Sequence, residues 1–224
     1  MSWVYLSHTI KESTPLYNNN GNVQIERISS ILNGDSCNSS SLSMPVHSGT
    51  HIDAPYHFDK NGKTLEHYSP DFWFASNPFL IEIKAKPGIL LTLKELKSNL
   101  KAVPSNTDIL LIKTGAEEWR DSSDPSYSIK GVGFELEVVE WMRTYLNLKF
   151  LGFDFISLSS PLHREIGRSA HRILLSNHAS GKKPILIIED MSLTEINATP
   201  KKVLVIPMRY EQSDGSMVTV LAEI

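Results

Sequence analysis

Three imidazoles and one carboxylate lie within the eleven residues that run from His47 to His57. The segment reads His-Ser-Gly-Thr-His-Ile-Asp-Ala-Pro-Tyr-His, and its inner donors are His51 and Asp53. Imidazole nitrogen and carboxylate oxygen are the usual protein ligands of Zn²⁺, and they also suit Mn²⁺ and Fe²⁺. This density of donors predicts a metal site. The alternative is a polar loop whose histidines bond only to the backbone.

The glycine and prolines around these donors favour a bent, extended segment over a helix. In an extended segment His51 and Asp53 point the same way, because strand side chains alternate between the two faces. The pair is therefore expected to hold one ion. His57 would lie about 20 Å from His51 in a fully extended chain. We therefore expect a turn near Pro55, which brings His57 back toward the site.

A second candidate group lies in the C-terminal half of the chain. His171 falls in a helical pattern over 168–175, where it shares a face with leucines and points inward. Glu189 ends the apolar run 185–188, and a carboxylate there is costly to bury without a cation. The alternative interpretation makes His171 a hydrogen-bonded core histidine and Glu189 an ordinary strand-end carboxylate. Asp190 is the rival carboxylate at this strand end.

The whole-chain numbers indicate one soluble domain over 1–224. The chain has 224 residues, 41% of them hydrophobic, and a formal net charge of −3. It has no long basic run, so nucleic acid is a poor partner. Its pattern predicts neither a transmembrane segment nor a signal peptide, and its one cysteine, Cys37, excludes an intrachain disulfide framework. A cytoplasmic location without membrane attachment is expected.

The elements that must position the candidate ligands are mostly strands. Alternating and apolar runs predict strands over 4–7, 23–31, 42–46, 79–84, 109–113, 150–158, 185–188, 203–209 and 217–222. Helical periodicity is found over 93–100, 134–146 and 168–175. This order predicts a sheet-rich, layered α/β domain.

The donor segment His47 to His57 resembles the signature of the metal-dependent cyclase-like hydrolases, a family that includes bacterial kynurenine formamidase and isatin hydrolase. Similarity extends along most of the chain, through residues 6–8, 14–17, 112–115, 152–154 and 206–215. The resemblance implies a compact β/β/α layered fold, a centre of one or two metal ions and hydrolysis of C–N or ester-like bonds. Zn²⁺ is the usual metal and Mn²⁺ occurs in some branches. It also implies a homodimer or a higher homo-oligomer.

Carried over by position, the resemblance assigns roles to six residues. It implies that His47, His51 and Asp53 hold the first metal, with Asp53 able to bridge. It further implies that His171 and Glu189 complete a second site. His57 matches a histidine that transfers protons, and an unperturbed imidazole pKa of about 6.5 suits that role.

The predicted protein is therefore a hydrolase that opens an amide, formamide, lactam or lactone bond of a small molecule. A metal-activated water would attack the carbonyl, with His57 as acid and base. Arylformamidase-like activity is the best single expectation. The alternative is a non-catalytic, metal-dependent protein that binds a small molecule on the same scaffold.

Other candidate residues carry weaker signals. Gly34-Asp35-Ser36 resembles the start of a serine esterase block, but no partner motif follows it and it reads as a turn. Cys37 lacks features that would activate a thiolate. Arg164 and Arg168 could orient a substrate carboxylate, although a solvated helix face is the expected role. The aromatic residues Trp3, Tyr17, Tyr68, Phe72, Trp73 and Phe74 could wall a pocket, with core or dimer packing the favoured alternative.

Overall fold

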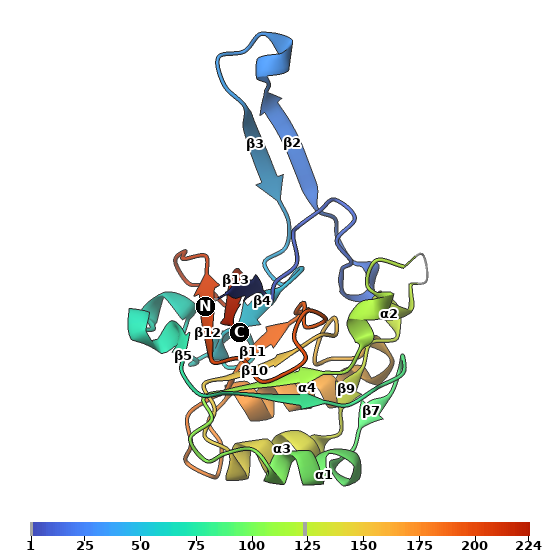
Figure 1. Ribbon diagram of the computed structural model, residues 1–224, viewed down its shortest axis with the longest axis vertical. Coiled ribbons are helices and arrows are strands. Elements are labelled where there is room, and N and C mark those ends of the chain that lie inside the picture. The colour runs from blue at the N-terminus through green and yellow to red at the C-terminus, as the bar shows by residue number, and fades with distance from the viewer. Residues whose placement is uncertain (1, 123–124) are drawn as a thin grey trace.

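The computed structural model describes residues 2–122 and 125–224, and a nine-stranded mixed sheet dominates it (Figure 1). Its strands are β1 (Trp3–Tyr5), β4 (His51–Asp53), β5 (Phe74–Ala75), β6 (Pro78–Glu82), β8 (Ile109–Lys113), β10 (Phe150–Phe153), β11 (Leu186–Glu189), β12 (Lys202–Pro207) and β13 (Gly215–Glu223). The order is β5-β12-β13-β4-β11-β10-β8-β6, and β1 pairs with β13. The strands β6, β8, β10 and β11 run parallel, whereas β4, β12 and β13 join antiparallel.

Alternation along the parallel strands builds two hydrophobic cores. Leu110 and Ile112 of β8 face one core, which they share with the helices α1 (Leu93–Lys101), α3 (Leu136–Tyr145) and α4 (Arg164–Leu175). Ile109 and Leu111 face the other core, together with apolar side chains of β12 and β13. The long sheet therefore folds over on itself, and the helices cover the outer face of its parallel half. This arrangement is the β/β/α layered α/β fold that the sequence predicted.

Shorter elements complete the body. α2 (Ser126–Ile129) is a short helix, and β7 (Leu90–Leu91) pairs in parallel with β9 (Gly133–Phe134). The short 3-10 helices are η1 (Tyr17–Asn19), η2 (Ile31–Asn33), η3 (Pro55–His57), η4 (Leu65–His67), η5 (Pro70–Trp73), η6 (Ala116–Trp119) and η7 (Pro161–His163). None of the helices in the described residues is long and apolar enough to cross a membrane.

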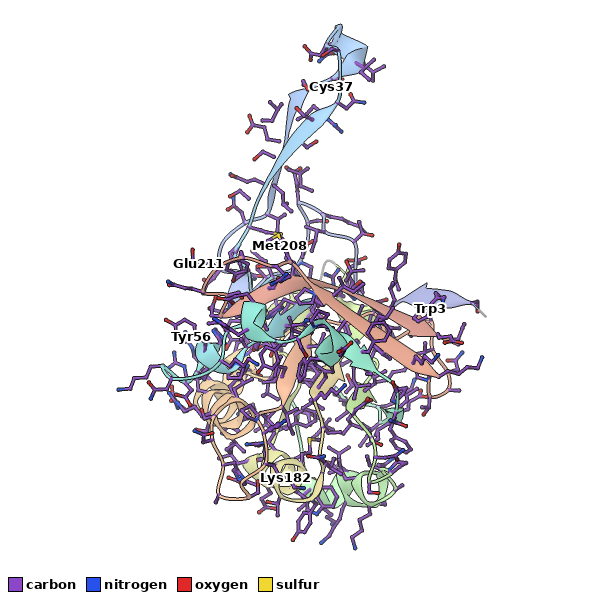
Figure 2. The ribbon with its side chains drawn as sticks, turned by 90° about the vertical axis from the view of Figure 1, so that its left-hand side faces the viewer. Trp3, Cys37, Tyr56, Lys182, Met208 and Glu211 are labelled. Carbon is purple, nitrogen blue, oxygen red and sulfur yellow. The ribbon has the colours of Figure 1, made fainter. Side chains whose placement is uncertain are left out.

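A long hairpin projects from the body as an arm. It consists of β2 (Gln24–Ser29) and β3 (Ser39–Ser43), which pair only with each other. Figure 1 shows the arm rising away from the layers, and Figure 2 shows Cys37 near its tip. Large aliphatic side chains are exposed on it, including Leu32, which is 96% exposed. Cys37 is an exposed thiol, and Gly34 adopts the left-handed conformation of a turn.

Strong apolar periodicity predicted the core elements well. β8 has the predicted bounds, 109–113, and α1 and α3 agree with their predicted ranges to within two residues. Thr92 and Glu95 form a capping box that begins α1. The turn expected near Pro55 is η3, and the segment before it is extended as β4.

Three predicted ranges differ from the observed elements by three or more residues at an end. The strand predicted over 150–158 ends at Phe153, because the chain then bends around the end of β11 and hydrogen-bonds to Asp190 N–H and to Glu189. The strand predicted over 42–46 is Ser39–Ser43, an exposed run of serines without a burial pattern. The helix predicted over 168–175 begins one turn earlier, at Arg164.

Candidate metal centre

The register of β4 places three donors on one face of the sheet. His51 pairs with Glu189 of β11, and Asp53 pairs with Ile187. Because side chains alternate, His51 and Asp53 lie on one face, while Ile52 enters the core on the other. Directly paired residues of antiparallel strands have Cβ atoms about 4.5 to 5.5 Å apart. Glu189 therefore meets the two β4 donors, as the predicted same-face arrangement required.

Helix α4 adds the fourth donor from above this face. Its residue Gly167 packs against the loop that follows β10, and a Cβ atom at that position would lie 2.2 Å from Ser159 Cα. Only glycine permits this approach, and it lowers the helix onto the sheet. His171, one turn further along α4, is thereby buried against Asp53 and Glu189.

Four side chains form a closed ring of donor atoms, here called the donor ring: His51, Asp53, His171 and Glu189. His51 Nε2 lies 3.5 Å from Asp53 Oδ1 and 3.3 Å from Glu189 Oε2. His171 Nε2 lies 3.4 Å from Asp53 Oδ2 and 3.3 Å from Glu189 Oε1. Zinc ligands with bonds of about 2.0 to 2.1 Å lie about 3.3 Å apart in a tetrahedral site. The contacts between neighbouring donors match this spacing, and donor atoms of His51, Asp53 and Glu189 all lie within 4.8 Å of one another.

Backbone carbonyls orient both histidines of the donor ring. His51 Nδ1 donates to the carbonyl of Gly49 at 2.9 Å, and His171 Nδ1 donates to the carbonyl of Gly167 at 2.8 Å. This leaves each Nε2 directed at the two carboxylates. Metal-bound histidines almost always donate their second ring N–H in this way. The arrangement fits a divalent cation held by two imidazoles and two carboxylates.

Neighbouring donors also fix the carboxylate of Glu189. Its Oε1 accepts from the backbone N–H of Leu158 at 2.6 Å and from Ser157 Oγ at 3.2 Å. These bonds come from the segment where the predicted strand bends away from the sheet. The bend therefore helps to hold a candidate ligand in place.

The electrostatics of the donor ring indicate a site that needs positive charge. Burial would lower the pKa of His171, but its bonds to Asp53 and Glu189 raise that pKa to about 10. Burial and the charge of Asp53 would raise the pKa of Glu189, yet the two ring histidines lower it to about 2. Buried carboxylates are stable only when paired. Either protons on the histidines or a bound cation would supply that charge.

His47 lies beside the donor ring and bridges two carboxylates. Its Nδ1 is 2.8 Å from Asp53 Oδ1, and its Nε2 is 2.9 Å from Asp214 Oδ2. Burial would lower the pKa of His47, but these two hydrogen bonds raise it to about 10. Gly215 permits the close approach, since a Cβ atom there would lie 2.4 Å from the His47 ring. The structure thus groups His51 with Glu189 and His171, while His47 shares Asp53 with them.

His57 lies at the edge of the same cluster. Its ring stacks on His47 with centroids 3.9 Å apart, and its Nδ1 lies 3.4 Å from Asp214 Oδ2. The side chain is 29% exposed, so it faces both the donors and the solvent. Burial lowers the pKa of His57 and outweighs the attraction of Asp53. A neutral imidazole at this position can accept a proton.

Two donor groupings with close spacing share Asp53 within the described residues. One contains His51, Asp53 and Glu189, and the other contains His47, Asp53 and His57. All five residues predicted as metal ligands, and the predicted acid-base residue, line one cavity.

The rival carboxylate Asp190 points away from the site. It receives hydrogen bonds from Arg120 Nε at 2.7 Å and from Tyr127 Oη at 2.5 Å. Adjacent residues at a strand end face opposite sides, so Glu189 faces the donor ring while Asp190 faces Arg120. The structure thereby decides between the two candidates.

Asp214 is the site residue that sequence reasoning missed. It comes from the turn between β12 and β13, a stretch whose sequence indicates only a closing hairpin. An aspartate next to a glycine in such a position is typical of a turn. Its distance along the chain from His47 and His57 concealed its contacts with them.

The donors lie in a cavity of about 380 Å³. Its lining also includes Pro15, Tyr17, Ser48, Phe58, Ile156, Ser157, Ser159, Arg164 and Arg168. Tyr17 is thus the one residue of the predicted aromatic set that lines this cavity. Phe72 and Trp73 instead pack with Phe150 in the core, which agrees with the core packing that the sequence favoured for them. The cavity has the size of a small-molecule site.

Comparisons with known proteins show the family and the fold of this chain. The Cyclase family model matches residues 4–160. Cyclase-like protein 2 of Oryza sativa subsp. japonica is 27% identical over 199 residues, which cover 84% of this chain and 66% of the rice protein. Cyclase-like protein 1 of Arabidopsis thaliana is 22% identical, over 94% of this chain and 80% of the plant protein. The chain thus spans about two thirds to four fifths of these relatives.

Solved structures share the fold over nearly the whole chain. Isatin hydrolase A from Ralstonia solanacearum matches with a TM-score of 0.77 at 22% identity, covering 99% of this chain and 91% of that one. An isatin hydrolase bound to the product analogue thioisatinate matches with a TM-score of 0.80 at 18% identity, covering 98% and 91%. The protein belongs to the cyclase family, and its fold is that of isatin hydrolase.

Proposed function

We propose that this protein is a metal-dependent hydrolase that opens a C–N or ester-like bond in a small carbonyl compound. Amides, formamides, lactams and lactones are the substrate classes, and arylformamidase-like activity is the best single expectation. The observation that carries the proposal is the donor ring, in which both Nε2 atoms meet two buried carboxylates. Membership of the cyclase family and the fold of isatin hydrolase support it.

The donor ring would hold a divalent cation, with Zn²⁺ favoured and Mn²⁺ as the alternative. Once bound, such an ion supplies a Lewis acid and lowers the pKa of a coordinated water to about 7. His47 is 2.8 Å from Asp53 and belongs to the other donor grouping, so it would contribute to a second ion. The proposed stoichiometry is one or two ions per chain.

The chain's own residues would handle the proton. His57 is partly exposed and burial lowers its pKa, so its imidazole can accept a proton during attack on the carbonyl and return it to the leaving nitrogen or oxygen. Asp214 stabilises the charged form of His57 from 3.4 Å away. Phe58 stacks on His171 with ring centroids 4.6 Å apart and forms part of the cavity wall.

We also propose that the protein forms a homodimer through the arm. A two-stranded hairpin alone is marginally stable in water. The arm nevertheless exposes Ile25, Ile28, Ile31, Leu32 and Leu42, each at least 41% exposed. Packing against a second copy of the chain would cover these side chains. Sedimentation of Leu32→Asp would show a monomer, whereas an unchanged dimer would exclude this role of the arm.

Metal analysis combined with a substrate screen tests the proposed function. The purified protein should contain one or two equivalents of Zn²⁺ or Mn²⁺ and should hydrolyse an aryl formamide, a lactam or a lactone. Activity should be lost with a chelator and return with the metal. Metal binding without turnover of any of these classes would instead identify a non-catalytic binding protein.

A further inference from the structure

Two arginines extend the candidate site along one face of α4. Arg164, Arg168 and His171 follow one another at spacings of four and three, which places them on the same side of the helix. Both arginines line the cavity that contains the donor ring. Along the helix axis, the Cα atom of Arg168 lies about 4.5 Å from that of His171, and the Cα atom of Arg164 lies about 10.5 Å from it. The two positively charged side chains therefore lie within the length of a small molecule from the donor ring.

No buried acid neutralises these two guanidinium groups. Arg168 Nη1 contacts Glu165 Oε1 at 3.0 Å, but the Glu165 side chain is 80% exposed and the pair is open to solvent screening. Within residues 2–122 and 125–224, no carboxylate lies within ion-pair distance of Arg164. The carboxylates of the donor ring face the histidines instead.

Two hydroxyl groups of the same cavity lack partners. In the described part of the chain, Tyr17 Oη and Ser48 Oγ are buried and make no hydrogen bond. Buried polar atoms are nearly always hydrogen-bonded, so both hydroxyl groups are available to hydrogen-bond a molecule that enters the cavity. Tyr17 also lies near both arginines, whose charges oppose the rise in its pKa that burial causes.

We propose that the substrate carries a carboxylate in addition to the bond that is hydrolysed, and that Arg168, assisted by Arg164, binds this carboxylate. The planar guanidinium matches a carboxylate with two parallel hydrogen bonds, and the hydroxyls of Tyr17 and Ser48 can donate to the same substrate. A cavity of about 380 Å³ accommodates a substrate with a single ring. The substrate class is then an acidic aryl amide or formamide. This inference rests on the proposed function of the site.

A matched pair of substrates tests the inference. Formanilide is neutral, and meta-formamidobenzoate is the same molecule with a carboxylate. For Arg168→Gln, the KM for meta-formamidobenzoate should rise about tenfold or more, while the KM for formanilide stays unchanged. The KM of Arg168→Lys for meta-formamidobenzoate should lie between those of wild type and Arg168→Gln, because lysine keeps the charge but lacks the planar guanidinium. An equal change for both substrates, or no change, would overturn the inference.

Arg172→Gln is the matched control, because it removes the same charge from α4 at a residue outside the cavity lining. It should leave both KM values as they are. An equal rise in the KM for meta-formamidobenzoate in Arg172→Gln would reduce the effect to general electrostatics and overturn the inference.

A binding measurement separates this inference from the proposed hydrolysis. Equilibrium dialysis of the full-length, metal-free protein should show meta-formamidobenzoate bound more tightly than formanilide, and Arg168→Gln should remove the difference. This result without turnover in the metal-loaded protein would refute only the hydrolysis. Equal binding by wild type and Arg168→Gln would refute the carboxylate site, whatever the activity.

Discussion

Asp214 Oδ2 lies 3.4 Å from His57 Nδ1, and the same oxygen accepts a hydrogen bond from His47 Nε2 at 2.9 Å. A carboxylate from the turn between β12 and β13 thus connects a candidate acid-base residue to a candidate metal ligand. The hydrogen bond with His47 lowers the pKa of Asp214 to about 2, so this carboxylate is charged at neutral pH. Its position suits the stabilisation of a proton on His57.

Replacing the Asp214 carboxylate should slow turnover without removing the metal. Asp214→Asn keeps the shape of the side chain and loses its charge, so kcat should fall about tenfold to a hundredfold. Metal content should be unchanged, because Asp214 is not part of the donor ring. Glu211→Gln is the control, an exposed acid in the same turn (Figure 2). An unchanged kcat for Asp214→Asn would exclude the assigned role.

The donor-ring residues should be necessary for metal binding. His51→Ala and Asp53→Ala each remove a donor from a buried ring, and both proteins should lose metal and turnover together. His67→Ala is the matched control, since His67 is a mostly exposed histidine that bonds to Thr64. Elemental analysis after dialysis measures the effect. Full metal content in both donor-ring variants would contradict the assignment.

His57 should act in catalysis and not in metal binding. His57→Ala should retain the metal while kcat falls about 10² to 10⁴-fold, the usual contribution of a general acid or base. Metal content and kcat are measured on the same sample. Loss of the metal from this variant would reassign His57 as a ligand in the grouping with His47 and Asp53.

The Glu66 carboxylate should contribute stability that disappears in acid. It accepts hydrogen bonds from Gln212 N–H and Ser213 Oγ, each at 2.7 Å. Slight burial would raise the pKa of Glu66, but these bonds lower it to about 2. A pKa that is depressed in the folded protein gives stability above the ordinary value near 4.5, and that stability is lost as the pH falls toward 2.

Urea unfolding of wild type and Glu66→Gln at several pH values tests whether the Glu66 carboxylate stabilises the protein at neutral pH and loses this effect in acid. The variant should unfold more easily at pH 7, and the difference between the two free energies of unfolding should shrink between pH 4.5 and about 2. A difference that is constant over this range would show that the Glu66 charge has no such role.

The buried ion pair of Arg120 and Asp190 should be important for stability. Arg120 Nη2 lies 2.8 Å from Asp190 Oδ2, and both side chains are at most 3% exposed. Arg120→Met leaves a buried carboxylate without its cation, which should cost about 3 to 5 kcal/mol. Arg120→Met combined with Asp190→Asn should recover part of this loss. A cost below about 1 kcal/mol would contradict the pairing.

The sequence predicted those parts of the site that depend on local pattern. Alternation placed His51 and Asp53 on one side of an extended segment, and Pro55 indicated the turn that returns His57. Helical periodicity directed His171 inward. Each of these inferences needed only neighbouring residues, and the structure confirms the geometry.

The remaining features depend on contacts between distant segments. Asp214 was missed because only the pairing of β13 with β4 brings it to His47. The end of β10 was placed too late, since the apolar residues after Phe153 are buried in a bend as they would be in a strand. The arm itself was not predicted: the strand expected over 23–31 agrees with β2 to within two residues, but the exposed serines of β3 gave no burial signal for its bounds.

The most direct test of the central claim is an anomalous difference map from crystals grown with Zn²⁺, recorded on both sides of the zinc absorption edge. A peak is expected inside the donor ring, bounded by His51, Asp53, His171 and Glu189. A fully occupied zinc ion elsewhere, or a donor ring without a peak in zinc-replete crystals, would contradict it.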